Sequence, residues 1–174
     1  MTDRTKSPSA SAIHHNVHKV FPNDLNSEYT VFGGLVMGLC DRTALIVAER
    51  HAGCTCVTAA VDSLNFLAPA RSGDTLILKA SVNRAWRSSM EIGVHVAAEN
   101  SYTGERRHVV SAYLTFVALG DDGRPVDVPT LRPETGDEQR RYEEAGRRRE
   151  ARLAARPDQR IPLSTPPPHA GKAR

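Results

Sequence analysis

The sequence predicts an α+β fold in which one long, curved antiparallel sheet wraps around a single central helix. An almost wholly apolar segment runs from Gly34 to about His51, as is typical of a helix enclosed by its own protein. Four strand-like segments follow it, and a strand of about 12 residues reaches about 40 Å. Because a helix of about 18 residues measures only about 27 Å, the longer strands must bend around it.

The elements are expected in the order strand, helix and four strands. A short strand is expected at residues 17–21, and the helix should stop at Gly53, after a polar end at residues 49–51. The four later strands are expected at 55–66, 75–86, 90–96 and 108–119. Apolar and polar residues alternate between 90 and 96, which is the period of a half-buried strand. Turns are expected at 72–74 and 122–123.

One domain, covering residues 13–133, accounts for these elements. Residues 1–12 are polar and are expected to form a disordered arm. Residues 134–156 are charged and predict a helical extension, with Gly136 and Gly146 as its weak points. The tail at 157–174 is rich in proline and is expected to be disordered.

Composition excludes several classes of protein. The net charge is +3, and the basic residues gather in the tail, where interleaved acids and few aromatics favour a solvated surface over a nucleic-acid partner. No apolar run could span a bilayer and no secretory signal is present, so we expect a cytoplasmic protein with no membrane partner. The three cysteines have no framework spacing, which fits a reducing compartment.

No metal site is predicted. The Cys54-Thr-Cys56 pair has no second cysteine pair to complete a ligand set. His14 and His18 would lie about 13 Å apart in a strand, too far to share an ion.

The predicted architecture requires a partner. One sheet cannot cover an apolar helix on every side, and its edge strands would be left unpaired. Both problems favour a homodimer, and they allow a larger assembly such as a hexamer built as a trimer of dimers.

Five stretches carry a family resemblance. They are NSEYTVFGGLVMGLCD, TAAVDSLNF, RSSMEI, SAYLTFVAL and DGRPVDVPTLRPETGDE. In this order and spacing they resemble the hotdog-fold acyl-CoA thioesterases, in particular the brain-type acyl-CoA hydrolases and their single-domain bacterial relatives. The resemblance implies the hotdog fold and an enzyme that hydrolyses acyl-CoA to free CoA and fatty acid without a cofactor.

By this resemblance the family's catalytic pair falls on Asn26 and Asp41. Asp41 lies seven residues beyond Gly34 on the same helix face, about 10 Å along the axis, too far to serve one carbonyl within one chain. Two antiparallel helices across a dimer would bring Asp41 of one subunit to Asn26 and Gly34 of the other. Asp41 would be a general base or a direct nucleophile, and Asn26 would orient the water or the carbonyl.

The start of the helix suits a developing negative charge. Gly33 and Gly34 have no β-carbon, so a carbonyl oxygen can approach their backbone closely. The N–H of Gly34, together with that of Leu35, is predicted to form an oxyanion hole. The resemblance assigns binding of the CoA moiety to Gly33, Arg87, Ser88 and Ser89.

Two positions depart from the family pattern: Tyr29 stands where relatives have glycine, and Leu67-Ala68 stands where they have His-Lys. Asp62 matches a family acid, for which we expect a structural role. The alternatives are a hotdog protein that binds acyl-CoA without hydrolysing it, and a buried Asp41 that only caps a neighbouring loop. A dehydratase would need a histidine, and none lies in the loop or in the buried part of the helix.

Overall fold

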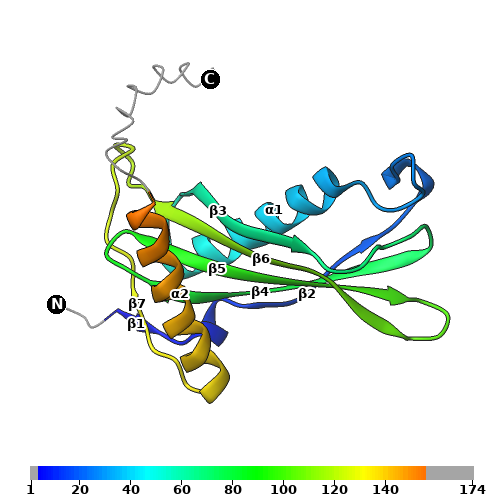
Figure 1. Ribbon diagram of the computed structural model, residues 1–174. Coiled ribbons are helices and arrows are strands. Elements are labelled where there is room, and N and C mark those ends of the chain that lie inside the picture. Colours follow the sequence, from blue (N-terminus) through cyan, green and yellow to red (C-terminus); the bar gives the residue numbers. More distant parts are fainter. Residues whose placement is uncertain (1–3, 156–174) are drawn as a thin grey trace, which may run out of the picture.

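The computed structural model describes residues 4–155 as a curved sheet with one long helix against each face (Figure 1). The strands of the sheet are β2 (Ile13–Lys19), β3 (Cys56–Phe66), β4 (Asp74–Ala85), β5 (Ser89–Asn100) and β6 (Arg106–Ala118). They are antiparallel and lie in the order β2-β4-β5-β6-β3. The two helices are α1 (Gly33–Ala52) and α2 (Gly136–Ala154). This confirms the predicted α+β architecture, and the predicted helix and strands deviate from the observed ones by only a few residues.

Among residues 4–155, the sheet covers one side of helix α1. Val36, Cys40, Ala44 and Val47 lie against the inner face of the sheet and are at most 4% exposed. Gly53 ends the helix in the left-handed conformation at φ 75°, and its N–H donates to the carbonyl of Glu49 at 2.7 Å.

Two apolar residues of α1, one on each flank of its open side, are not covered by residues 4–155. Met37 and Ile46 are 48% and 41% exposed. One sheet therefore leaves part of this apolar helix open, as the sequence predicted.

Strand β3 forms an edge of the sheet with an apolar surface. Its neighbour is β6, and within residues 4–155 no strand pairs with its other side. Val57, Val61 and Phe66 on this strand are 42%, 54% and 52% exposed. The pairing with β6 shifts register between Thr58 and Ala60 and again after Val61, so the strand is irregular near its middle.

The prediction of a disordered arm at 1–12 is wrong for the residues that the structure describes. Thr5–Lys6 forms β1, which pairs in parallel with β7 (Thr130–Leu131), and a 3₁₀ turn follows at Pro8–Ala10. The Lys6 ammonium donates to the carbonyls of Arg50 and His51 at 2.9 and 2.8 Å. These carbonyls belong to the last turn of α1, where backbone acceptors are unpaired and a positive charge is favourable.

The charged extension forms α2, which crosses the outer face of the sheet (Figure 1). Thr135 and Glu138 cap its first turn reciprocally. Gly146 is buried where the Arg84 guanidinium comes so close that a β-carbon would collide with it. This glycine is therefore a point of close contact with the sheet. Residues 1–3 and the predicted disordered tail at 157–174 lie outside the described residues.

On the outer face of the sheet, Gly93 lies close against the side chain of Asn83. Asn83 is 2% exposed and its amide nitrogen donates to Glu91 at 2.9 Å. A β-carbon on Gly93 would lie 2.7 Å from that nitrogen, and an amide that moved aside would lose its hydrogen bond to Glu91. We expect Gly93→Ala to lower the free energy of unfolding by about 1–3 kcal/mol, measured by urea denaturation.

The background variant Asn83→Ala provides the control. Once the amide is absent, Gly93→Ala should cost nothing further in stability. An equal loss in both backgrounds would show that the penalty does not come from this contact.

Candidate active site

A cavity of about 430 Å³ opens beside the N-terminus of α1. The loop before the helix contributes Asn26, the helix contributes Gly33, and the end of β3 contributes Phe66. The rest of the lining is mainly apolar and includes Val31, Val36, Leu67, Leu76, Val109 and Val110. The cavity can therefore hold an apolar chain beside a small number of polar groups.

Asn26 organises the loop in front of this cavity. Its side-chain oxygen accepts from the amides of Glu28 at 2.9 Å and Thr30 at 3.2 Å, and its nitrogen donates to the Thr30 hydroxyl at 3.0 Å. The side-chain nitrogen keeps one further hydrogen for a ligand. Tyr29 adopts φ 57° in this turn, a left-handed conformation that glycine adopts without strain. A glycine would therefore adopt this conformation with less strain than Tyr29.

The start of α1 carries free backbone donors. Among the described residues, the amides of Gly33 and Gly34 have no acceptor, and Phe32 at the N-cap provides no side-chain cap. The N–H of Leu35 already donates to the carbonyl of Phe32 at 3.0 Å, so Leu35 is not the second free donor that the sequence suggested. The two glycine amides lie at the positive end of the helix dipole.

Asp41 lies outside this cavity, two turns further along α1. Its side chain is half-buried, and the hydroxyl of Thr58 on β3 donates to its Oδ1 at 2.6 Å. Its other oxygen has no hydrogen-bond or ion-pair partner within residues 4–155. Within one chain, Asn26 and Asp41 therefore do not meet.

Thr58 is a candidate that sequence reasoning missed. Its contact with Asp41 joins a helix to a strand. Thr58 begins the TAAVDSLNF stretch, but nothing in that stretch points to Asp41. The neighbouring Cys40 is fully buried, and burial together with the nearby Asp41 raises the pKa of its thiol to about 12, which disfavours the thiolate.

The predicted CoA-binding turn lies at the other end of the sheet. Arg87 and Ser88 fall between β4 and β5, with Ser89 as the first residue of β5. The Arg87 side chain is 79% exposed and faces Asp127 at 3.6 Å, and the carbonyl of Ser88 accepts from Ala118 at the end of β6. Val110, near the start of β6, lines the cavity. The eight residues from Val110 to Ala118 span about 26 Å of strand, which places the turn at the far end of the sheet from the cavity.

The described residues hold no group of three His, Cys, Asp or Glu side chains that could bind a metal ion. Neither α1 nor α2 is apolar enough over its length to cross a membrane, and the rest of residues 4–155 offers no such helix.

Known proteins provide the comparison for this geometry. A family model described as the Thioesterase superfamily matches residues 29–105. The uncharacterized acyl-CoA thioester hydrolase YkhA of Bacillus subtilis is 44% identical over 120 residues, which cover 69% of this chain and 70% of that protein. The chain belongs to the acyl-CoA thioesterase family. It spans only 23% of the length of another member, mouse acyl-coenzyme A thioesterase 11, to which it is 39% identical over 139 residues.

Solved structures of thioesterases share the fold. The acyl-CoA hydrolase of Staphylococcus aureus, in complex with butyryl-CoA and CoA, is 40% identical with a TM-score of 0.82, over 87% of this chain and 92% of that chain. A hexameric acyl-CoA thioesterase without ligand is 37% identical with a TM-score of 0.84, over 87% and 97%. For the S. aureus enzyme, structures also exist of variants with one asparagine, one aspartate or one threonine changed to alanine. These neighbours confirm the predicted hotdog fold.

Proposed function

We propose that this thioesterase hydrolyses acyl-CoA to free CoA and fatty acid at two equivalent sites, each built from two subunits of a homodimer. The observation that carries the proposal is the separation of two half-sites in one chain. Asn26, Gly33 and Gly34 surround one end of α1, while Asp41 and Thr58 lie further along it. Both halves adjoin the uncovered apolar side of α1 and the free edge of β3.

A second copy would cover this open surface. Met37 and Ile46 on α1, with Val57 and Val61 on β3, present exposed apolar area that association would remove from water. Pairing of two β3 edges would also satisfy their unpaired backbone groups. The hexameric relative supports assembly of such dimers into a trimer of dimers.

Antiparallel pairing of the two β3 edges would also bring the CoA-binding turn to the cavity. Strand β3 ends at Phe66, beside Gly33. A β-carbon added to Gly33 would lie 3.2 Å from the Phe66 ring. Cys56 begins β3 and pairs with Ala118, which in turn bonds to Ser88. The Phe66 end of one copy would meet the Cys56 end of the other, so Arg87 of the second subunit would approach the first subunit's cavity.

In such a site each group has a chemical task. The glycine amides would stabilise the negative charge that develops on the thioester oxygen, and the apolar cavity would hold the acyl chain. Thr58 fixes one oxygen of Asp41 and leaves the other to act on the thioester, directly or through a water molecule. Asn26 would orient that water or the carbonyl with its remaining hydrogen.

The S. aureus relative supports these roles. The asparagine, aspartate and threonine that were changed there have the same spacing along their chain as Asn26, Asp41 and Thr58 here. We further propose that the reaction requires no metal or other cofactor and takes place in the reducing cytoplasm to which the cysteine usage points.

The direct test is release of free thiol from a panel of acyl-CoAs from acetyl to palmitoyl, with and without a chelator. We expect turnover on part of the panel and no loss with the chelator. Acyl-CoA binding without thiol release would instead identify a binding protein, and loss of turnover that zinc restores would refute the cofactor-free reaction.

Mixed dimers test the composite site. Asp41→Ala and Asn26→Ala should each fold, dimerise and lose about 10²–10⁴ in kcat. After subunit exchange about half the dimers are mixed, and each has one site with both changes and one with neither, so roughly a quarter of wild-type activity should return. If activity stays absent while exchange is verified by mass spectrometry, both residues act within one chain.

Arg87→Ala tests recognition of the nucleotide part of CoA. If Arg87 binds the substrate and the transition state equally, its removal should raise KM with little change in kcat. The effect should shrink with a pantetheine thioester, which lacks the nucleotide. Arg124→Ala, another exposed arginine at 85%, serves as the matched control. An equal loss on both substrates would assign Arg87 to structure or chemistry.

A further inference from the structure

We propose that α2 positions the active-site strand from the outer face of the sheet, with Arg152 and Asp62 as the positioning residues. Their ion pair holds the irregular middle of β3 so that Thr58 presents its hydroxyl to Asp41. The inference rests on the proposed function, since it assigns a purpose to the contact between Thr58 and Asp41.

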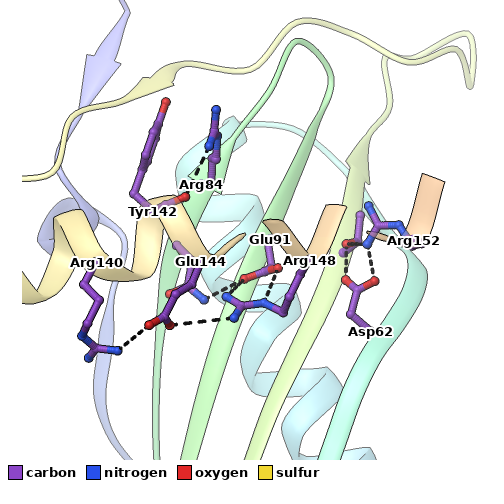
Figure 2. A network of polar contacts seen from close by, with 10 residues as sticks. Asp62, Arg84, Glu91, Arg140, Tyr142, Glu144, Arg148 and Arg152 are labelled. Atoms are coloured by element: carbon purple, nitrogen blue, oxygen red, sulfur yellow. Dashed lines mark hydrogen bonds and ion pairs between the residues drawn. The ribbon is translucent and has the colours of Figure 1, made fainter. Parts of the chain in front are cut away.

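Two nearly buried acids lie under α2 in one row across the strands (Figure 2). Glu91 on β5 is 1% exposed, and Asp62 on β3 is 6% exposed. Arg148 and Arg152, one turn apart on α2, each bind one of them. Buried carboxylates are costly unless paired, so the two arginines fix how α2 sits on the sheet.

The two ion pairs have different geometries. Arg148 binds Glu91 with two nitrogens, Nη2 to Oε1 at 2.7 Å and Nε to Oε2 at 3.0 Å. Arg152 uses Nη1 alone, which donates to Asp62 Oδ1 and to the Thr115 hydroxyl at 2.7 Å. Thr115 in turn donates to Asp62 Oδ2 at 2.7 Å. Arg152, Thr115 and Asp62 thus form a closed triangle that joins α2, β6 and β3.

The two acids also differ in what else holds their strands. Strand β5 has hydrogen-bonded neighbours on both sides, β4 and β6, whereas within residues 4–155 β3 pairs with β6 alone. The β3 ladder is irregular on both sides of Ala60, which pairs with Thr115. Such irregularities re-aim side chains and are frequent beside active sites.

The triangle therefore holds residues 58–62 of β3, the stretch whose register is least well set by the hydrogen bonds to β6. Thr58 stands at one end of this stretch and Asp62 at the other. If Arg152 were absent, the Asp62 carboxylate would be drawn towards water, and residues 58–62 would shift with it. The hydroxyl of Thr58 would then leave its 2.6 Å contact with Asp41.

The test compares Arg152→Met with the matched variant Arg148→Met. Both keep an apolar stem and remove one ion pair between α2 and the sheet. We expect Arg152→Met to lower kcat about tenfold with KM nearly unchanged, because small misplacements of catalytic groups cost rate. Arg148→Met should lower Tm at least as much but leave kcat of the folded enzyme intact. If Arg148→Met fails to fold, Arg148→Lys replaces it.

A double-mutant cycle with Thr58→Val decides whether Arg152 acts through Thr58. In the Thr58→Val background, Arg152→Met should cost no further kcat. Arg152→Lys should restore most of the activity, since one nitrogen makes both contacts. The same fold loss from Arg152→Met in both backgrounds, or an equal loss of kcat from Arg148→Met, would overturn the proposal.

Hydrogen exchange separates this inference from the proposed function. Arg152→Met should speed exchange of the amides of residues 58–62, whereas Arg148→Met should not. If the wild-type protein lacked thioesterase activity, the proposed function would be refuted, but hydrogen exchange in the two variants could still be compared. Unchanged exchange in Arg152→Met would refute the positioning role whatever the activity.

Discussion

The exposed apolar side of α1 is the constraint on which the rest of the structure depends. The helix is apolar on nearly every face, and the inner face of the sheet covers only the side that carries Val36, Cys40 and Ala44. Met37 and Ile46 remain open to solvent, and within residues 4–155 the outer edge of β3 is also unpaired. An apolar surface of this kind is stable when a second copy covers it, and such a seam is where a carboxylate such as Asp41 can face a substrate.

Much of the fold could be predicted because its signals are local. The limits of α1 follow from a largely apolar run and from Gly53, and the strand limits follow from turn residues such as Gly73 at φ 89°. The N-terminal arm could not be predicted, because β1 has only two residues and is held by Lys6, which contacts helix carbonyls more than forty positions away. A short strand with distant partners leaves no periodic pattern in the sequence.

The candidate site was predictable in part for the same reason. Asn26, Gly33 and Gly34 share one short stretch, and the structure brings Asn26 and Gly33 to one cavity. The contact between Thr58 and Asp41 depends on how a helix packs on a strand, which the sequence does not encode locally. The functions of these residues, and the joining of Asn26 with Asp41 across two subunits, stay predictions.

The charged extension shows why a charge pattern alone is a weak guide to burial. Interleaved arginines and acids in this region favoured a solvated surface, yet Arg148 and Arg152 turn inward onto Glu91 and Asp62. The alternation of residues 90–96 identified the outward face of β5, but it could not tell that a helix covers Glu91. Figure 2 shows the two pairs, Arg148 with Glu91 and Arg152 with Asp62, under α2.

The placement of α2 would solve a problem that the proposed composite site creates. In the proposed dimer the lateral side of β3 would pair with a second copy, and its inner face already lies against α1, where Thr58 donates to Asp41. The outer face is the remaining side from which β3 can be held, and a purely apolar contact there would allow sliding along the strand. A nearly buried ion pair tied to Thr115 has a single geometry, because displacement of either partner leaves an unpaired charge. The fold can thus keep its edge open to a partner and still hold Thr58 against Asp41.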